Sequence, residues 1–444
     1  MKIKPTIGLI NLGCPKNLVD AEVMLGILSD NGYSINLDED AADIMLVNTC
    51  SFVKDAEKES VKAIVRLAEL GKKLIITGCL AQKYKKELME AVPEALAVVG
   101  TGDIDKIAKI VDTFTGRSSQ AVYQVTDDPV YLQSQNTNRF QITVGSSSYI
   151  KIAEGCDYTC GYCIIPALRG KYRSRSIESI VEEAKKLGQD GVSEIILIAQ
   201  DTTSYGKDLF GKPSLGDLLE KLNDVEEISW IRVMYAFPSL LNDKLIKIIA
   251  KLDKVVKYID IPLQHSHPEI LRSMNRPVMD NSAVIKKLRD IIPDVAIRTA
   301  FIVGYPGETQ EHYEHLYEFI EQNKFDKLGV FEYSREKNTS SYSMKKQIPA
   351  KVKKARKKEL MQLQQGISRN INESFVGKTI PVIVETLTSS GEIIGRSYRD
   401  APEIDGLVYI ESDKALVPGD IWPVKITSAS EYDLFGVVLN FSMG

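Results

Sequence analysis

Residues Cys156–Cys163 read Cys-Asp-Tyr-Thr-Cys-Gly-Tyr-Cys, a CxxxCxxC spacing of Cys156, Cys160 and Cys163. They follow the apolar run Tyr149–Ala153 directly, and that run is typical of a buried strand. Three thiolates on one short loop can bind three irons of a 4Fe-4S cluster, whereas an electron-transfer ferredoxin binds all four irons through cysteine. The fourth iron is then open to a ligand, which indicates chemistry at the iron.

A zinc site is the alternative interpretation of this loop. Zinc takes four ligands, usually as two CxxC-type pairs or with histidine. The sequence supplies no fourth cysteine or histidine close to the loop, and the nearest histidine is His265. Spacing and context therefore favour the iron–sulfur cluster.

The region that begins with this strand alternates strands and helices over 149–333. Six βα units are too few for a closed barrel of eight, so an open or partial barrel is expected. The predicted strands are Tyr149–Ala153, Glu194–Ala199, Trp230–Tyr235, Lys257–Ile261, Val295–Val303 and Gly329–Tyr333.

The first 115 residues show a second alternation, which predicts an α/β fold with an open parallel sheet. Cys14, Cys50 and Cys79 each lie at or just past the carboxyl end of a predicted strand, where ligands bind in such sheets. Convergence on a metal and a plain role as small apolar core residues both fit this placement. The predicted strands are Ile7–Ile10, Ile44–Val47 and Leu74–Thr77, with helices over 17–31, 52–70 and 82–91 and a weaker strand–helix pair at 97–99 and 104–114.

Two further regions follow from composition. Residues 116–145 are polar and predict a linker or a partly ordered connection. Ala350–Asn372 predicts a basic helix that either contacts RNA or carries a solvated face. The tail 376–444 predicts a small antiparallel β barrel of five strands. That tail carries an acidic surplus of five charges.

The overall composition fits a soluble globular protein of about three domains. No apolar run is long enough to span a bilayer, and Met1–Pro5 leads into a strand pattern instead of a signal peptide. A cytoplasmic location is therefore expected, where six cysteines serve as metal ligands, redox groups or core residues and not as disulfides.

The loop at Cys156–Cys163 resembles the signature of the radical S-adenosylmethionine (SAM) superfamily, whose core is a partial barrel of six βα units. In that superfamily SAM chelates the open iron, and one electron from the cluster cleaves it to methionine and a 5′-deoxyadenosyl radical. With the amino-terminal cysteines and the tail barrel added, nearly the whole chain resembles the methylthiotransferase family. The matching motifs are Leu12–Asn17, Asn48–Cys50, Gly78-Cys79, and Gly155–Pro166 followed by Arg169-Gly170.

The resemblance implies three domains: an amino-terminal methylthiotransferase domain at 1–135, a radical-SAM domain at 142–373 and a TRAM domain at 376–444. It implies two 4Fe-4S clusters and SAM as cofactors, with the second cluster binding or supplying sulfur. One SAM would donate the methyl group and a second SAM would furnish the radical. The implied metal ligands are Cys14, Cys50, Cys79, Cys156, Cys160 and Cys163. Residues acting in catalysis beyond these are not identified.

Four further residues are expected to contact SAM in such a fold. Gln200 ends a predicted strand and is expected to reach the ribose. The other three also have an ordinary structural interpretation: packing under the loop for Tyr162, a surface ion pair for Arg298 and a helix start for Gly304. The cations that follow the loop are expected to neutralise SAM, to face the substrate or to be solvated; they are Arg169, Lys171, Arg173 and Arg175. His265 and His267 lie past a strand end, where a polar loop role is favoured over substrate contact, and His312 and His315 lie on a charged helix face.

The family has two main branches, one that modifies tRNA adenosine (MiaB-like) and one that modifies the β-carbon of an aspartate in small-subunit ribosomal protein S-twelve. Cys14–Asn17 and Leu263–His265 resemble the protein-modifying branch. An acidic tail would repel RNA and attract a basic ribosomal protein, although the same charge also keeps a barrel soluble. The implied partners are S-twelve, either free or within the small ribosomal subunit, a low-potential electron donor and a sulfur donor. No membrane partner is expected. A non-catalytic iron–sulfur protein that binds RNA or transfers electrons is the alternative from another class.

Overall fold

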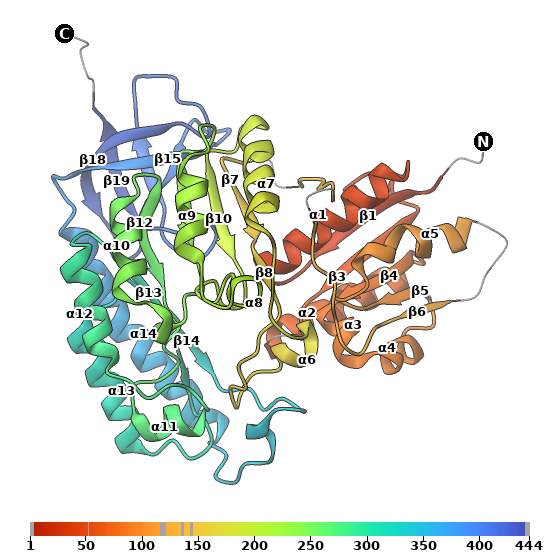
Figure 1. Ribbon diagram of the computed structural model, residues 1–444, viewed down its shortest axis with the longest axis horizontal. Coiled ribbons are helices and arrows are strands. Elements are labelled where there is room, and N and C mark those ends of the chain that lie inside the picture. Colours follow the sequence, from red (N-terminus) through yellow and green to blue (C-terminus); the bar gives the residue numbers. More distant parts are fainter. Residues whose placement is uncertain (1–3, 52, 116–120, 135–136, 143–144, 440–444) are drawn as a thin grey trace. The chain divides into compact units, whose positions relative to one another are not determined.

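The structure is a computed structural model that describes residues 4–51, 53–115, 121–134, 137–142 and 145–439 (Figure 1). The chain divides into two compact units. The first holds residues 1–143, 151–159 and 163–175, and the second holds 144–150, 160–162 and 176–444. Among the described residues, no helix is long and apolar enough to cross a membrane.

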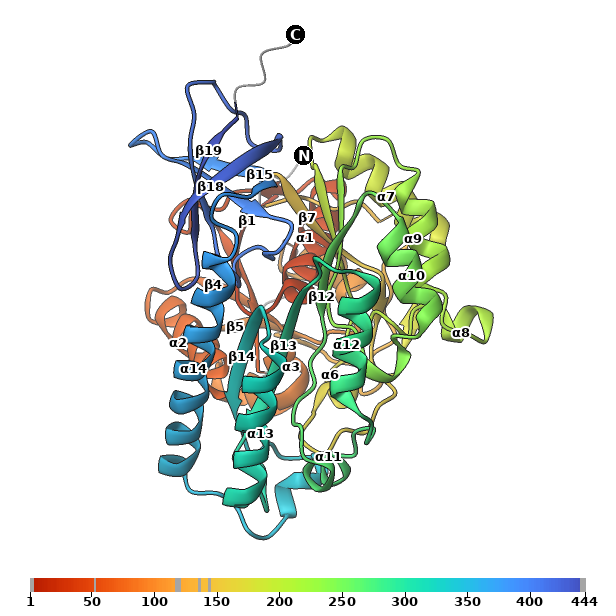
Figure 2. The same ribbon diagram turned by 90° about the vertical axis from the view of Figure 1, so that its left-hand side faces the viewer.

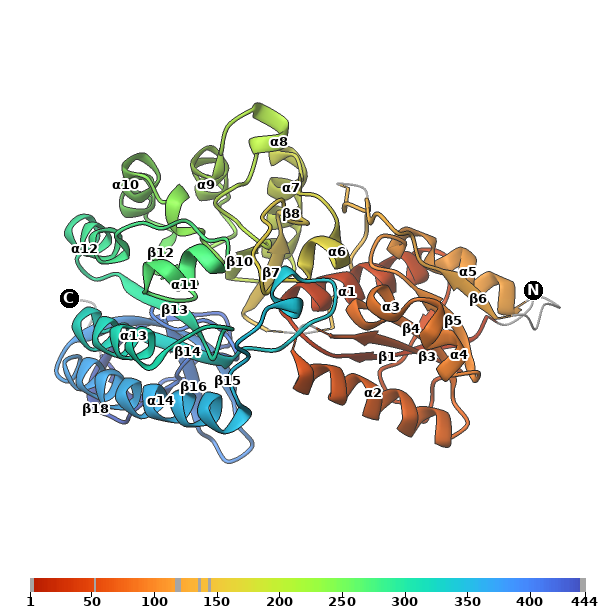
Figure 3. The same ribbon diagram turned by 90° about the horizontal axis from the view of Figure 1, so that it is seen from below.

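The first unit is built on a six-stranded parallel sheet in the order β2-β1-β3-β4-β5-β6. Its central strand β3 is buried along its whole length, as expected for a parallel strand covered on both faces. Figure 3 shows α2 on the opposite face of the sheet from α1 and α5. The elements are β1 (Thr6–Asn11), α1 (Pro15–Asp30), β2 (Ser34–Ile35), β3 (Ile44–Thr49), α2 (Lys54–Glu69), β4 (Lys73–Gly78), α3 (Cys79–Tyr84), α4 (Lys86–Ala91), β5 (Ala95–Val99), α5 (Ile107–Thr115) and β6 (Val122–Gln124).

One local prediction for this unit needs correction, and another gains detail. The polar segment 116–145, expected to be a linker or a partly ordered connection, contains β6, which adds an edge strand beside β5. The helix expected over 82–91 begins earlier and is broken into α3 and α4 by Lys85, whose φ of +50° cannot continue a right-handed helix. Residues 116–120, 135–136 and 143–144 of the polar segment, and residue 52, the first of the helix expected over 52–70, lie outside the described residues.

The second unit holds another six-stranded sheet, in the order β14-β13-β12-β11-β10-β7, with parallel neighbours from β10 to β14. The connecting helices follow one another around one side of this sheet (Figures 2 and 3). The prediction of an open, partial barrel is confirmed. The elements are β7 (Ser147–Lys151), α7 (Ile177–Gln189), β10 (Glu194–Ile198), α9 (Leu215–Asn223), β11 (Trp230–Val233), α10 (Asp243–Lys251), β12 (Val255–Asp260), α12 (Asn281–Ile291), β13 (Ala296–Val303), α13 (Gln310–Asn323) and β14 (Lys327–Glu332).

Several short elements connect or flank these. They are β8 (Ala153–Glu154), which pairs with β9 (Arg173–Ser174), the helices α6 (Ile165–Arg169), α8 (Lys207–Phe210) and α11 (Pro268–Ser273), and the 3-10 turns η1 (Ile104–Lys106), η2 (Pro238–Leu240) and η3 (Ser340–Ser343). The predicted basic helix is present as α14 (Ala350–Glu373).

The tail forms a closed five-stranded barrel in the order β15-β16-β17-β19-β18, around a buried core of aliphatic side chains. Four pairings are antiparallel as expected, but β17 and β19 run parallel, which periodicity within single strands cannot reveal. The strands are β15 (Thr379–Leu387), β16 (Ile393–Ser397), β17 (Val408–Glu411), β18 (Ile421–Ala429) and β19 (Leu434–Val438).

Buried ion pairs join this barrel to the sheet of the second unit. Arg396 and Arg232 both bind the buried Glu194, and Arg399 binds Asp326. Removing one partner of such a buried pair typically costs about 3–5 kcal/mol, because the remaining charge is left uncompensated. Part of the charge in the tail therefore holds the barrel in place instead of facing a partner.

Candidate active site

The carboxyl ends of β1, β3 and β4 lie side by side, since Asn11 is in register with Asn48, and Asn48 with Thr77. Cys14 caps the amino end of α1, Cys50 follows β3, and Cys79 begins α3. The structure therefore brings the three amino-terminal cysteines to one edge of one sheet. We call them the edge cysteines.

Close contacts define how tightly this edge is packed. A Cβ at Gly13, where φ is +106°, would lie 2.7 Å from the Cβ and 3.0 Å from the Sγ of Cys50. The hydroxyl of Ser60 on α2 accepts a hydrogen bond from the Cys50 N–H at 2.9 Å and donates one to the Cys50 carbonyl at 3.0 Å. The turn before α1 thus needs glycine, and the backbone of Cys50 is fixed from the other side.

Asn17, on the first turn of α1, connects the three strand ends. Its amide nitrogen donates to the carbonyls of Leu12 and Thr49 at 3.0 and 2.9 Å. Its Oδ1 accepts from the Sγ of Cys79 at 3.7 Å. The sequence motif contains Asn17, but its role as a connector appears only when the sheet is assembled.

Arg169 is the residue whose place beside the edge cysteines the sequence did not predict. A role in neutralising SAM or facing the substrate was expected, whereas its guanidinium lies buried against the edge cysteines. It contacts the Sγ of Cys79 at 3.5 Å and the Oδ1 of Asn17 at 2.5 Å, and it binds the carboxylate of Asp20. Lys151 binds Asp20 and Glu154, so that two buried cations and two buried anions form one network.

The electrostatics of this network follow from burial and pairing. Burial by itself lowers the pKa of Arg169, but the negative charges of Cys79, Asp20 and Glu154 raise it by more. The net effect is a raised pKa, so the guanidinium stays charged. Burial raises the pKa of the Cys79 thiol, and Arg169 opposes that rise. A fixed positive charge therefore faces a position where a metal-bound thiolate would carry negative charge. One sign of this buried network is visible in the sequence, because Lys151 is a charged residue inside an otherwise apolar predicted strand.

The CxxxCxxC loop is anchored at its start by backbone geometry. Gly155 has a φ of +84°, and a Cβ there would lie 2.1 Å from the Lys171 carbonyl oxygen. The Cys156 N–H donates to the Gly170 carbonyl at 3.0 Å, and the Asp157 carboxylate accepts from the Tyr172 N–H at 3.1 Å. The loop can therefore leave β8 only with glycine before Cys156.

The tip of the loop is fixed separately, within the second unit. The Gly161 N–H donates to the Met274 carbonyl at 2.8 Å, and the Gly161 carbonyl accepts from the Ser341 N–H at 2.9 Å. Tyr162 packs against an apolar cluster that includes Tyr305. Cys156, Cys160 and Cys163, which we call the loop cysteines, are all partly exposed.

The four expected SAM contacts differ in their surroundings. The Gly304 N–H donates to the Glu308 carboxylate at 2.8 Å. Arg298 pairs with Asp260 at 3.0 Å and with Asp405 at 3.6 Å, so it forms ion pairs, but these are mostly buried and not on the surface as the alternative interpretation had them. Gln200 follows β10, and Tyr162 packs as described. Contact of these four residues with SAM stays a prediction.

Both sets of cysteines fit the cofactors that the fold implies. Each set offers three soft thiolate ligands, which suit an iron–sulfur cluster with one iron left open. At the edge cysteines the buried guanidinium of Arg169 adds charge compensation. Ligation itself stays a prediction for all six cysteines.

Comparison with known proteins places the chain in three successive families. Residues 6–100 match the uncharacterized protein family UPF0004, residues 150–320 the radical SAM superfamily and residues 376–439 the TRAM domain. A solved structure of the radical SAM methyltransferase TsrM from Kitasatospora setae has a similar fold, with a TM-score of 0.56 over 77% of both chains at 15% identity. The fold and sequence thus define a radical-SAM enzyme with an added TRAM barrel.

Curated relatives narrow this class. The chain is 48% identical to ribosomal protein uS12 methylthiotransferase RimO of Crocosphaera subtropica over 98% of this chain and 99% of that one. The enzyme of the same name from Acaryochloris marina is 48% identical over 99% and 100%. The chain belongs to the RimO family of radical-SAM methylthiotransferases. The predicted fold class and enzyme class are confirmed, and the tRNA-modifying alternative is not favoured.

Proposed function

We propose that this chain transfers a methylthio group to the β-carbon of an aspartate in ribosomal protein uS12, the protein called S-twelve above. Full-length identity of 48% to proteins of that name is the observation that carries the proposal. We place the enzyme in the cytoplasm, because the proposed substrate is a ribosomal protein.

We assign the loop cysteines to the cluster that binds SAM and the edge cysteines to the cluster that handles sulfur. When bound, these groups supply the electron that cleaves SAM and the sulfur that is transferred. The chain positions them: Gly155 and Gly161 fix the two sides of the loop, and Arg169 and Asn17 fix the thiol of Cys79. Turnover also needs a low-potential electron donor and a sulfur donor from outside the chain.

The surface charge of the barrel supports a basic protein as substrate. Asp400, Asp405, Arg396 and Arg399 have buried side chains that pair within the second unit. The charges of these two acids and two bases cancel, so the other residues of the tail still carry its acidic surplus of five charges. Excess negative charge attracts a basic ribosomal protein and repels RNA phosphates.

The basic helix α14 bears on the alternative partner, RNA. Part of its charge is already used inside the fold, because Arg356 binds the buried Glu308 and the Lys353 amine donates to the Tyr333 carbonyl at 2.8 Å. Other lysines of α14, such as Lys354 and Lys358, are exposed. We propose that these face ribosomal RNA around the substrate protein.

The test is an anaerobic reaction of the reconstituted enzyme with SAM and a reductant. Free uS12, purified small subunits and tRNA serve as three separate substrates. A mass increase of one methylthio group on an aspartate of uS12 is expected, with unmodified tRNA. Modification of tRNA with unchanged uS12 would refute the substrate assignment, and absence of 5′-deoxyadenosine in every reaction would refute the radical mechanism.

A further inference from the structure

All four histidines of the chain gather in one place in the second unit. They are His265, His267, His312 and His315, which lie on two segments about fifty residues apart in sequence. The ring centroids of His267 and His312 are 4.2 Å apart, and those of His267 and His315 are 5.1 Å apart. The proposed cluster chemistry does not use this group.

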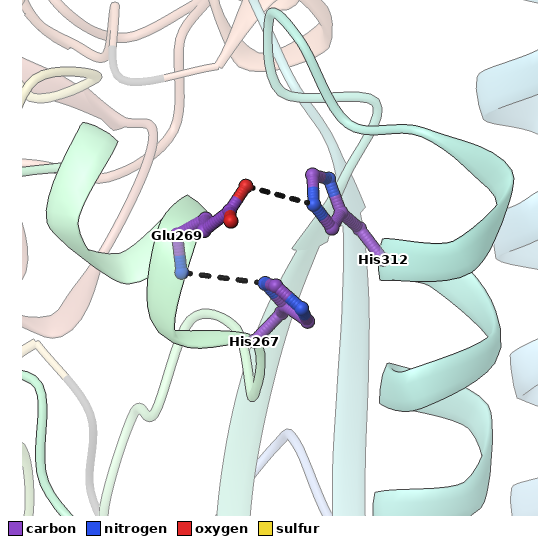
Figure 4. A group of neighbouring side chains, drawn as sticks. All are labelled: His267, Glu269 and His312. Atoms are coloured by element: carbon purple, nitrogen blue, oxygen red, sulfur yellow. Dashed lines mark hydrogen bonds and ion pairs between the residues drawn. The ribbon is translucent and has the colours of Figure 1, made fainter.

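Three residues of this group are arranged as metal ligands. His267 caps the amino end of α11, Glu269 lies in its first turn, and His312 lies in the first turn of α13 (Figure 4). One ligand atom from each residue can be chosen so that all three lie within 4.8 Å of one another. The Glu269 Oε2 and His312 Nε2 atoms are 3.4 Å apart. Two ligands on one tetrahedral zinc ion, with bonds of about 2.0–2.1 Å, lie about 3.4 Å apart.

We propose that His267, Glu269 and His312 form a mononuclear site for a divalent transition-metal ion, Zn²⁺ or Fe²⁺. Two imidazoles and one carboxylate are a donor set that both ions accept, with the remaining positions open to water. The side chain of Glu269 is 70% exposed and that of His312 only 12%, so the ion enters from solvent on the glutamate side.

The rings are held ready by the surrounding structure. The Nδ1 of His267 accepts from the Glu269 N–H at 3.3 Å, and the Nδ1 of His312 accepts from the Thr309 N–H at 3.2 Å. Metal binding replaces both hydrogen bonds, because a ring that binds the ion has its Nδ1 either on the metal or protonated, and each ring takes the tautomer that frees its ligand nitrogen.

The chain offers variants that remove ligands and keep the helix caps. His267→Asn retains a good N-cap for α11, and His312→Gln retains the capping box that His312 forms with Thr309. Glu269→Gln removes the carboxylate of an exposed side chain. Matched controls are His315→Gln, one turn further along α13, and Glu311→Gln, the same charge change on an exposed residue of α13.

The experiment is equilibrium dialysis of the reconstituted holoenzyme, without oxygen, against buffers of fixed free Zn²⁺ or fixed free Fe²⁺. Zinc is counted by elemental analysis, and mononuclear iron is counted as iron in excess of acid-labile sulfide. One extra ion per chain is expected in the wild type and in both controls. Each of the three ligand variants should bind it about 100-fold more weakly or worse, since even an outer-shell partner is worth roughly 10–100-fold.

The zinc and iron arms identify which ion the site takes, and cluster content, measured as sulfide, should be equal in all six proteins. Wild-type affinity in the three ligand variants would overturn the proposal. So would equal loss in the two controls, or the absence of any extra ion in the wild type. Because this readout measures neither SAM cleavage nor methylthio transfer, its failure would leave the proposed methylthiotransferase function standing.

Discussion

The loop cysteines and the edge cysteines reach comparable donor sets by opposite routes. The loop cysteines lie within eight residues, so their grouping is set by the local chain. The edge cysteines are spread from position 14 to position 79 and meet only because three parallel strands end together. The first set needs a loop of the right shape, and the second needs a folded sheet and a buried cation. Local spacing therefore specifies one centre, and tertiary structure specifies the other.

The largest expected effects come from removing the proposed cluster ligands themselves. Replacing Cys156, Cys160 or Cys163 with Ala should abolish SAM cleavage, because the cluster that binds SAM loses an iron ligand. Replacing Cys14, Cys50 or Cys79 with Ala should spare part of the SAM cleavage and abolish sulfur insertion. Both are measured on reconstituted protein, as 5′-deoxyadenosine formed and as methylthio product. If edge and loop variants inserted sulfur equally well, the division of labour between the two sets would be wrong.

Arg169 tests whether the edge site depends on its buried cation. Arg169→Met leaves Asp20 and Glu154 with less compensation in a buried site, which should lower the free energy of unfolding by about 3–5 kcal/mol. The variant should also lose the iron of the edge cluster and keep that of the loop cluster. Urea unfolding and iron content measure the two effects. Lys171→Met, which removes an exposed charge two residues away, is the control and should match the wild type.

An Arg169→Lys variant separates charge from geometry. Lysine restores the positive charge but not the planar fork that contacts Cys79, Asn17 and Asp20 together. We expect the free energy of unfolding of Arg169→Lys to lie between those of the wild type and Arg169→Met. The iron content of its edge site should still be reduced. Full recovery of iron in the lysine variant would mean that charge alone supports the edge site.

The contrast between the two sites also sets what the sequence could reveal. The partial barrel, the parallel sheet and the tail barrel follow from periodicity, and the CxxxCxxC spacing stands within one short segment. The contacts of Arg169 could not be predicted, since Arg169 lies beside the loop cysteines in sequence while its side chain contacts residues about 90 and 150 positions earlier. The parallel pairing of β17 with β19 was missed for the same reason. Pairing between distant segments leaves no trace in local composition.

Paired glycines sharpen the comparison with smaller changes. Gly13→Ala should impair the edge site and Gly155→Ala the loop site, because each has a positive φ and no room for a Cβ. Strain of this kind costs about 1–3 kcal/mol. Gly32→Ala is the control, since its φ of +76° imposes similar backbone strain but its Cβ would meet nothing within 4 Å. Gly13→Ala should lower mainly the iron content of the edge site. Gly155→Ala should lower mainly the iron content of the loop site and the formation of 5′-deoxyadenosine. Parallel loss of both clusters in either one would show that the sites are not independent.

The smallest effect is kinetic and appears when the clusters are removed. In reduced, cluster-free protein the partly exposed loop cysteines should react with iodoacetamide before Cys50 and Cys79, which are each only 5% exposed. Cys79 should be slow for a second reason: burial raises its thiol pKa, so less of the reactive thiolate is present at pH 8. Mass spectrometry of timed samples measures each site, and in urea all six should react at similar rates. Arg169→Met should slow Cys79 further wherever the fold survives, because the cation that favours its thiolate is gone. Fast labelling of Cys79 in the folded wild type would contradict a closed edge site and would assign both sets of cysteines to open, flexible surroundings.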